Sequence, residues 1–339
     1  MKRQAFNQQP DKPCAPRSAL HAPRSAVHAL VTGGAGFIGS NLCGALLARG
    51  WRVTAVDNFH LGRPEFVAPF RANAAFNFIK ADLLDLPRVK RLVRGCDVVF
   101  HMAANSDISR GARETDLDLS LGTLTTCNML EAMRLAGVRD IVFASSSAIY
   151  GLARVMPTPE DCGPLLPISL YGASKLAAEG FIAAFCHNFG LRAWIFRFAN
   201  IIGPNATHGA LFDFIRRLRK DPRALRVLGN GRQAKPYLHV SECVGGMIHG
   251  YEHVGDEVNY FNLAPRAGAT TVKFIAAAVV RALGLKRVKF EFTGGEQGWR
   301  GDVPQVRLDA RKLARLGWRA EMSSNAAVER AARELAGQL

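Results

Sequence analysis

The sequence predicts an α/β fold with a doubly wound parallel sheet, followed by a smaller α/β domain. Three observations support this prediction. Short apolar runs alternate with helical stretches up to about residue 199, and the runs are continuously apolar rather than alternating with polar residues. A glycine-rich segment separates the first apolar run from the first helical stretch. Parallel strands that are buried on both faces have this continuous pattern, and alternation with helices is typical of βαβ units.

The expected elements follow in chain order. Strands are expected at 27–32, 52–57, 76–80, 97–101, 140–145 and 192–197, with a return to the main sheet at 258–263. Helices are expected from the glycines to residue 47 and at 86–94, 116–136 and 171–189, the last two ending at Gly137 and Gly190. Shorter elements after Asn200 predict the second domain. A terminal helix is expected at 323–335, with Ser324 and Asn325 as cap candidates.

Composition narrows the possible functions. The chain has 339 residues and a net charge of +16. Such a charge raises the question of nucleic-acid binding, but the basic residues are spread along the chain. The cluster at 216–220 is explained by a solvated helix face, and anionic small molecules also suit the excess. We therefore expect a small-molecule partner rather than nucleic acid.

Two further patterns concern the surroundings of the protein. No apolar run reaches the about 18 residues that predict a membrane-spanning helix. The seven cysteines are scattered and include no Cys-x-x-Cys pair. This usage is typical of reduced thiols and favours a cytoplasmic protein. His249 and His253 lie four apart without a metalloprotease glutamate, so we expect no metal site.

The glycine segment predicts a dinucleotide site. Gly33, Gly36 and Gly39 lie between a predicted strand and a predicted helix, where a free helix N-terminus binds pyrophosphate. Asp57 ends the next strand, where a carboxylate hydrogen-bonds a ribose 2′-OH. A 2′-phosphate would meet like charge there, so NAD is favoured over NADP, with Arg63 as the nearby cation that could offset the charge. The fold is therefore expected to be Rossmann-like.

The third strand ends at Asp82 and Leu83. Asp82 could accept a hydrogen bond from the adenine amino group while Leu83 packs on the ring. Alternatively, Asp82 caps the helix that follows it.

A phenol and an ammonium group predict the chemistry. Tyr171 and Lys175 share one face of a predicted helix. An adjacent cation favours the phenolate, so Lys175 is expected to lower the pKa of Tyr171. Serines at 145–147 follow the fifth strand, whose carboxyl end faces the site in a parallel sheet. Together with the dinucleotide loop, these groups indicate hydride chemistry on an alcohol or ketone.

At these residues the chain resembles the extended short-chain dehydrogenase/reductases, which include the NAD-dependent epimerase/dehydratase family. It is most similar to the UDP-glucose 4-epimerase branch. The resemblance covers roughly residues 29–320. Its signatures lie at 32–39, 101–104, 145–151, 171–175, 197–200, 237–240 and 301–304.

The resemblance implies a set of site residues. The catalytic residues are Tyr171, Lys175 and Ser146. Cofactor contacts are expected at Gly33, Gly36, Phe37, Ile38, Gly39, Asp57, Asn58, Asp82, Leu83, Met102, Ala103, Ala104, Tyr171 and Lys175. Substrate contacts are expected at Ser106, Ser146, Ser147, Asn200, Val227, Lys235, Arg300, Asp302 and Val306. Lys235 and Trp299 stand where relatives often have arginine, and Leu119 where many have asparagine.

The resemblance also implies a reaction: epimerisation of a UDP-hexose at C4 through a 4-keto sugar. Related dehydratases and decarboxylases have carboxylates in the loop at 146–148, and this chain has none there. Val306 stands where a bulky tyrosine restricts some epimerases, so a UDP-N-acetylhexosamine could also enter. The alternatives are a nucleotide-sugar reductase, an epimerase at another carbon, or a non-catalytic NAD-binding protein.

Three regions are expected. Residues 1–28 are rich in Pro, Arg, Ala and Ser and predict a disordered extension, with a transit peptide or an early start codon as alternatives. Residues 29–199, with about 238–263, form the expected NAD-binding domain. Residues 200–237 and 264–339 form the expected nucleotide-sugar domain. The resemblance implies a homodimer that pairs the helices near 119–136 and 171–189.

Overall fold

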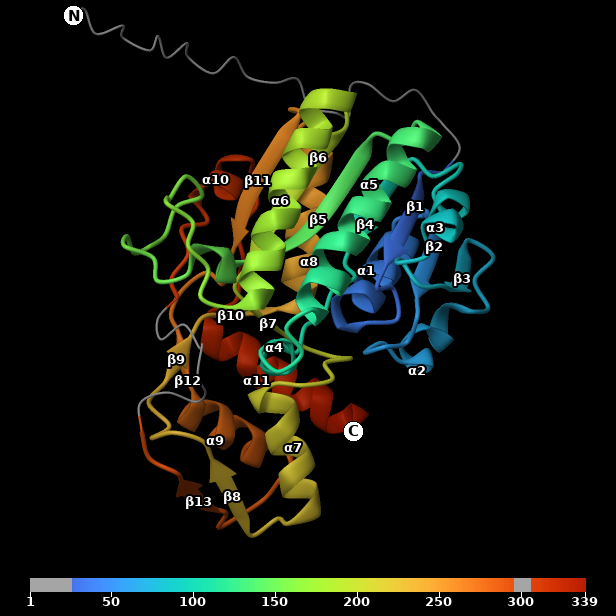
Figure 1. Ribbon diagram of the computed structural model, residues 1–339. Helices are drawn as coiled ribbons and strands as arrows, with labels where there is room; N and C mark the ends of the chain where they lie inside the picture. The colour runs from blue at the N-terminus through green and yellow to red at the C-terminus, as the bar shows by residue number, and fades with distance from the viewer. Residues whose placement is uncertain (1–25, 296–305) are drawn as a thin grey trace, which may run out of the picture.

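A seven-stranded parallel sheet forms the centre of the protein. The computed structural model describes residues 26–295 and 306–339. The strands are β1 (His28–Thr32), β2 (Arg52–Asp57), β3 (Phe76–Lys80), β4 (Val98–His101), β5 (Asp140–Ser146), β6 (Arg192–Phe198) and β11 (Val258–Leu263). Within the described residues their order is β11-β6-β5-β4-β1-β2-β3 (Figure 1). The strand order reverses between β1 and β4, which confirms the predicted doubly wound sheet.

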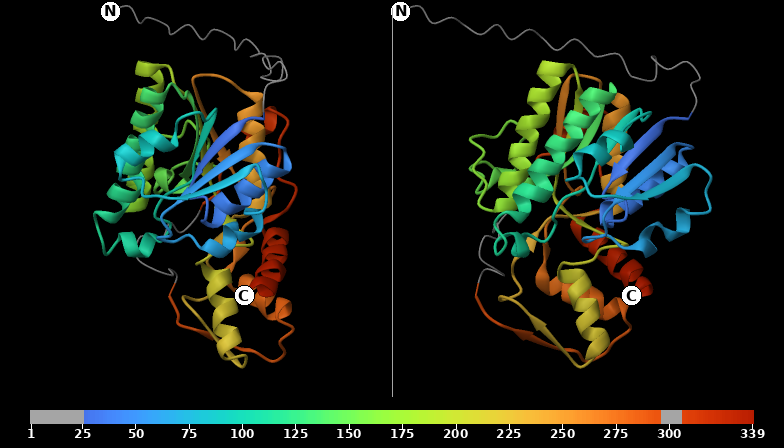
Figure 2. Two further views of the ribbon diagram at one scale, coloured as in Figure 1. Left: turned by 90° about the vertical axis from the view of Figure 1, so that its right-hand side faces the viewer. Right: turned by 45° about the vertical axis from the view of Figure 1, so that its right-hand side comes forward.

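Helices cover both faces of this sheet (Figure 2). On one face lie α1 (Phe37–Ala48) and α8 (Val240–His253); on the other lie α3 (Leu86–Leu92), α5 (Thr125–Ala136) and α6 (Leu170–Phe189). Each face has its own hydrophobic cluster. Within β5, Val142 packs on the α1 side, whereas Phe143 packs on the α6 side. Because both faces are buried, the strands have the continuous apolar runs seen in the sequence.

A C-terminal lobe lies below the carboxyl ends of the strands (Figure 1). Its hydrophobic cluster joins α7 (Ala210–Lys220), α9 (Val272–Ala282), α11 (Ser324–Gln338) and β8 (Ala224–Val227). The short strand pairs are β8 with β13 (Lys289–Phe292), β7 (Asn200–Ile202) with β10 (Tyr237–His239), and β9 (Ala234–Lys235) with β12 (Thr270–Thr271). The remaining short helices are α2 (Pro64–Val67), η2 (Ala68–Phe70), α4 (Ile108–Gly111), η3 (Leu119–Leu124), η4 (Ser147–Tyr150) and α10 (Arg311–Arg315).

Two expectations about helices were wrong. The stretch at 116–136 is not one α-helix, because η3 is a π-helix that precedes α5. The N-cap of α11 is Ser323, whose hydroxyl accepts a hydrogen bond from Ala326 N. The expected caps make tertiary contacts instead. Ser324 Oγ accepts a bond from Tyr237 N at 3.0 Å, and Asn325 Oδ1 accepts one from the Thr270 hydroxyl at 2.7 Å.

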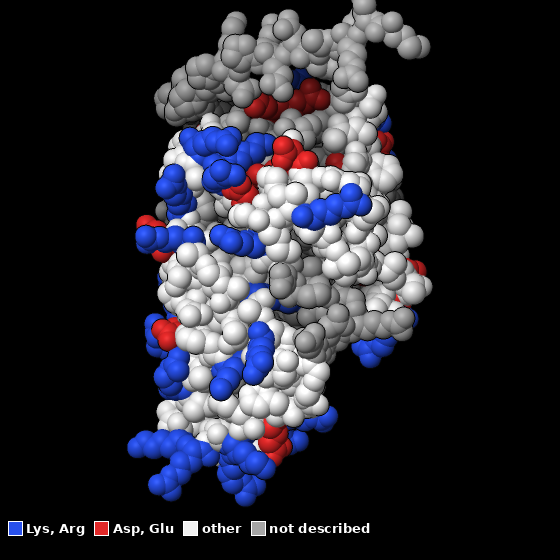
Figure 3. All heavy atoms as spheres, turned by 90° about the vertical axis from the view of Figure 1, so that its left-hand side faces the viewer, with Lys and Arg blue, Asp and Glu red and all other residues white. Residues whose placement is uncertain are grey.

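The basic residues do not gather in one place on the face drawn in Figure 3. Lys and Arg form separate groups there, with acidic residues between some of them. Among the helices in the described part of the chain, none has the length and apolar character needed to cross a lipid bilayer.

Candidate active site

The loop between β1 and α1 is shaped by its glycines. Gly33 has φ +63°, and a Cβ there would lie 2.9 Å from the backbone of Ala103 in the loop after β4. A Cβ at Gly39 would overlap the Gly33 carbonyl oxygen. Helix α1 has no side-chain N-cap and no acidic residue in its first turn. Its first amide groups and positive dipole end are therefore available, as a bound pyrophosphate requires.

Asp57 lies at the carboxyl end of β2 and is buried. Its carboxylate accepts hydrogen bonds from Ala35 N at 3.1 Å and from Phe59 N at 2.8 Å. Loss of hydration raises its pKa, and the backbone hydrogen bonds oppose this effect. A buried carboxylate with remaining acceptor capacity fits a ribose hydroxyl. The guanidinium of Arg63 lies over the Phe66 ring, 5.9 Å from its centroid.

Asn58 and Asp82 are in contact beside the end of β2, the strand that carries Asp57. Asn58 Nδ2 donates to Asp82 Oδ2 at 3.1 Å, and Leu84 N donates to Asp82 Oδ1 at 2.8 Å. The alternative interpretation of Asp82 as a helix cap is wrong, because Asp85 caps α3 through Arg88 N. Leu83 is buried in the cluster beneath α3 and α5. The structure thus brings Asn58, Asp82 and Leu83, which follow β2 and β3, together at the carboxyl ends of these two strands.

Tyr171 and Lys175 lie in the first two turns of α6, which Ser169 caps through Gly172 N at 3.1 Å. Lys175 is buried, and its Nζ donates to the Ala144 carbonyl of β5 at 2.6 Å. This bond holds the ammonium 5.8 Å from the centroid of the Tyr171 ring. The predicted pair is therefore assembled at the carboxyl end of β5.

The pKa of Tyr171 differs from the expectation. The surrounding protein raises it to about 12, mainly through desolvation, and the nearby Asp118 carboxylate also raises it. A hydrogen bond with Ser146 acts in the opposite direction. Burial likewise lowers the pKa of Lys175 to about 8. Desolvation therefore dominates both shifts, because burial disfavours the charged form of each group, and the expected lowering of the Tyr171 pKa by Lys175 is wrong.

The three serines after β5 have different surroundings. Ser146 caps η4 by accepting a bond from Ala148 N at 3.1 Å, and its hydroxyl also hydrogen-bonds the Tyr171 phenol. Ser147 is half-buried at the start of η4. Ser145 is buried and donates to Glu179 rather than facing the phenol. Of the three serines, Ser146 is therefore the one placed to act on the Tyr171 phenol, and its catalytic role stays a prediction.

A buried ion pair beneath this site was missed in the sequence analysis. Arg197 in β6 donates to Glu179 in α6 through Nε at 3.1 Å and Nη2 at 2.7 Å. Arg197 Nη1 also donates to the Tyr150 hydroxyl at 2.9 Å. Glu179 lies four residues after Lys175, so helical spacing was the available signal. The pair ties α6 to the two strands that carry the site.

The expected substrate residues are spread around the strand ends and the C-terminal lobe. Asn200 Nδ2 donates to the Pro236 carbonyl at 3.3 Å, and Lys235 is half-buried in β9. Val227 is buried in the lobe's core, whereas Ser106 is exposed after β4. Val306 packs against the cluster around Ile149 and Tyr150. Met102, Ala103 and Ala104 follow β4 and are half-buried. Arg300 and Asp302, with Trp299, lie outside the described residues.

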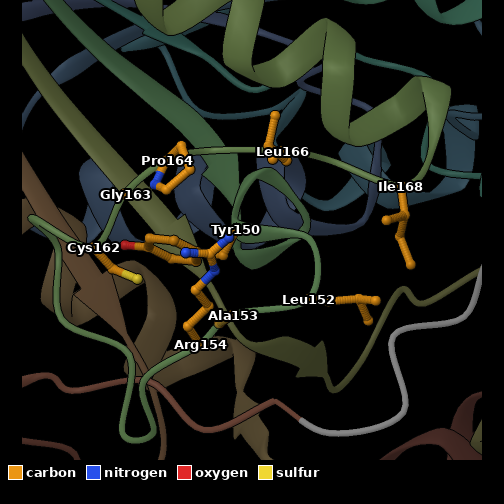
Figure 4. Close-up of a pocket in the computed structure, with 9 residues that line it drawn as sticks. All are labelled: Tyr150, Leu152, Ala153, Arg154, Cys162, Gly163, Pro164, Leu166 and Ile168. Carbon is orange, nitrogen blue, oxygen red and sulfur yellow. The ribbon is translucent and has the colours of Figure 1, made fainter.

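A pocket of about 230 Å³ lies between η4 and the start of α6 (Figure 4). Its walls include Arg154, Cys162, Leu166 and Ile168, with Tyr150 at its inner side. None of the predicted site residues lines it. The pocket is therefore separate from the group formed by Tyr171, Lys175 and Ser146.

Comparisons with known proteins identify the family of the chain. The profile of the NAD dependent epimerase/dehydratase family matches residues 29–264. A UDP-glucose 4-epimerase of Mycolicibacterium smegmatis is 31% identical over 87% of this chain and 94% of its own. A crystal structure of UDP-galactose 4-epimerase is 38% identical, with TM-score 0.82, over 92% of this chain and 100% of that one.

A UDP-glucose 4-epimerase of Thermotoga maritima, solved with UDP-glucose, is 27% identical with TM-score 0.82, over 92% of this chain and 99% of its own. The family match extends over the whole sheet, from β1 to β11, and includes both the glycine loop and the Tyr171–Lys175 turn. The chain therefore belongs to the NAD dependent epimerase/dehydratase family and uses NAD as its cofactor.

Proposed function

We propose that the protein is an epimerase of a UDP-hexose that inverts C4 through a 4-keto sugar. The observation that carries the proposal is the assembly of Tyr171, Ser146 and Lys175 at the carboxyl end of β5, in the same sheet whose β1 leads into the glycine loop. The UDP-glucose and UDP-galactose 4-epimerases among its relatives support the same reaction.

Each residue has a distinct part in this proposal. Tyr171 as phenolate removes the proton from the C4 hydroxyl, and Ser146 relays or orients that proton through its hydrogen bond to the phenol. The Lys175 ammonium stabilises the phenolate, since opposite charges attract strongly at a buried site. The glycine loop and Asp57 would hold NAD, which would supply reversible hydride transfer at C4. No net oxidation results, and Tyr171 returns the proton to the new hydroxyl.

The loop after β5 supports epimerisation over elimination. Ala148 lies against the start of α6, since a Cβ at Gly172 would lie 2.7 Å from its carbonyl oxygen, and Ser146 and Ser147 directly precede it. None of them has a carboxylic acid, and expulsion of a hydroxyl group is assisted by a general acid, a role for which a carboxylic acid is suited. A reaction that only moves a hydride and one proton requires no such group.

The proposal is tested with UDP-galactose and UDP-glucose as separate substrates. We expect each to convert to the same equilibrium mixture, measured by chromatography, without lasting NADH absorbance. Tyr171→Phe should lower kcat by about 10²- to 10⁴-fold, the usual contribution of a general base. Steady consumption of NADH would favour the reductase alternative. Undiminished conversion by Tyr171→Phe would refute the proposal.

Sugar size is a separate part of the proposal. Val306 packs against the hydrophobic cluster that contains Ile149 and Tyr150. These two residues lie in η4, which directly follows the strand β5 that carries Ser146. A short side chain there leaves room for an N-acetyl group. We expect Val306→Tyr to reduce turnover of UDP-N-acetylglucosamine more than turnover of UDP-glucose. Equal effects on both substrates would contradict this assignment.

We further propose that the C-terminal lobe holds the nucleotide and that the protein is a homodimer. The helices η3, α5 and α6 carry exposed apolar side chains. These are Leu119, Leu124, Leu135, Phe181 and Phe189, each between 46% and 54% exposed. Exposed apolar faces of this kind mark protein interfaces. Size-exclusion chromatography with light scattering measures the mass in solution.

A further inference from the structure

One buried carboxylate at the catalytic turn has no role in the proposed reaction. Asp118 directly precedes η3 and is 2% exposed. Its Oδ1 accepts a hydrogen bond from Asn105 Nδ2 at 2.9 Å. Its Oδ2 is buried and has no hydrogen-bond partner among the described residues. Burial of a carboxylate with an unpaired oxygen is costly, so such a group calls for a functional explanation.

The loop after β4 is built around this carboxylate. Asn105 is buried, and its amide also donates to the Asp107 carbonyl at 3.0 Å, which fixes its orientation toward Asp118. Gly111, at the end of α4, lies against Oδ2, and a Cβ there would overlap that oxygen. The Asp118 carboxylate therefore fills a space that exists because residue 111 has no side chain.

Close packing of η3 on α6 brings Asp118 to the catalytic turn. A Cβ at Gly122 would lie 2.6 Å from Ser174 Oγ, and Thr123 Oγ1 donates to the Ser174 carbonyl at 3.3 Å. Such π-helical turns are frequent at functional sites. The adjacent Leu119 is 54% exposed, so Asp118 is the polar side chain that this end of η3 places inside.

The charged groups around this turn come from four segments. Helix α6 contributes Lys175, Tyr171 and Glu179. Asp118 lies directly before η3, Asp107 lies in the loop after β4, and His101 lies in β4 itself. Desolvation lowers the pKa of Lys175, and the Glu179 and Asp118 carboxylates oppose this effect because a nearby anion favours the ammonium. Asp118 also raises the pKa of Tyr171, because an anion disfavours the phenolate. Burial, opposed by Asn105 and Lys175, raises the pKa of Asp118 itself.

We propose that Asp118 is a positioning residue for the proposed epimerase, because its buried carboxylate at the start of η3 helps to keep the Lys175 ammonium charged beside Tyr171. Lys175 uses one of its three N–H donors for the hydrogen bond to the Ala144 carbonyl, so two N–H groups remain for other partners. The anion offsets the desolvation of the ammonium. The inference rests on the proposed function, since it assigns Asp118 to the same turn of α6.

Asp118→Asn is the decisive variant. The amide retains an acceptor for Asn105 Nδ2 but removes the charge. The pKa values of Lys175 and Tyr171 should both fall, so both limbs of the pH profile of kcat/KM move to lower pH by about one unit. On the basic side of the profile we also expect kcat to fall, because less of the Lys175 is then charged, while KM for the nucleotide sugar stays within twofold.

Asp116→Asn is the matched control, because Asp116 is exposed and lies two residues away. It removes the same charge and should leave both limbs in place. Gly111→Ala is a second, independent variant. Its new methyl group displaces the Asp118 carboxylate without removing the charge, and the limbs should again move.

A readout without turnover separates this inference from the proposed function. Protein labelled with ¹³Cε-lysine allows the midpoint of Lys175 to be followed by NMR, with its resonance identified by its loss in Lys175→Met. The midpoint should be lower by about one pH unit in Asp118→Asn. A midpoint that does not move, or that moves equally in Asp116→Asn, overturns the inference. Absence of epimerisation by the unaltered protein would instead refute the proposed function, and the NMR result would still decide the role of Asp118.

Discussion

The buried ion pair between Arg197 and Glu179 gives a sharp test of how this site is supported. Both side chains are less than 10% exposed, at 7% and 8%. Glu179→Gln keeps the shape of the side chain and removes its charge. The Arg197 guanidinium would then remain buried without its counter-ion. Removal of one partner of a buried pair costs about 3–5 kcal/mol.

The structure places the expected loss at the lower end of that range. Arg197 keeps its bonds to the Tyr150 hydroxyl and, at 2.6 Å, to the Glu160 carbonyl. A glutamine also retains one acceptor oxygen. We therefore expect Glu179→Gln to reduce the free energy of unfolding by about 3 kcal/mol.

A matched control is available on the surface. Glu131 pairs with Arg134 on α5, and these side chains are 33% and 36% exposed. Since exposed pairs contribute little, Glu131→Gln should cost about 0.5 kcal/mol or less. Urea unfolding followed by circular dichroism measures both variants, with the slope of the transition checked for constancy. If the two variants lose equal stability, burial does not set the strength of this pair and the reasoning fails.

Three further predictions concern pH, packing and assembly. Burial lowers the pKa of His101 to about 3. Between about pH 6.5 and pH 3, His101 is therefore protonated in the unfolded chain but neutral in the folded protein. Protonation of the unfolded chain favours unfolding, so the stability that neutral His101 contributes above about pH 6.5 is lost as the pH falls toward 3. Urea unfolding between pH 5 and pH 7, in about one-unit steps, should show a shallower pH dependence in His101→Gln, and an unchanged dependence would contradict this assignment. Gly39→Ala should lower the melting temperature and NAD affinity because its Cβ overlaps the Gly33 carbonyl, whereas Gly180→Ala, on an open part of α6, should lower neither. Phe181→Glu should shift the mass from dimer to monomer in light scattering, and a persistent dimer would place the interface elsewhere.

Much of the fold could be predicted from the sequence because local patterns carry it. The runs at 52–57 and 76–80 became β2 and β3 with unchanged bounds, and 258–263 returned to the sheet beside β6. Strands buried on both faces leave an apolar signature that no distant contact is needed to interpret. The helix ends at Gly137 and Gly190 also follow from local chemistry, since both adopt the left-handed conformation.

Other features depended on contacts that the sequence does not reveal. The π-helix η3 interrupts an otherwise helical pattern where Gly122 meets Ser174. Ser324 has the residue type of a cap but bonds to Tyr237, 87 residues away. In both cases a tertiary partner replaced the local preference.

The sequence by itself determined which groups are at the site: a glycine loop, a phenol, an ammonium and a serine. The four-residue spacing of Tyr171 and Lys175 fixes the placement of that pair, because one helical turn is a rigid local unit. Only the tertiary structure decided their energetics. It buried Lys175 and partly buried Tyr171, and it placed the Asp118 carboxylate, from the start of η3, near enough to affect the pKa of both. Loss of water and the field of distant charges govern proton affinity, and neither is set by neighbouring residues in the chain.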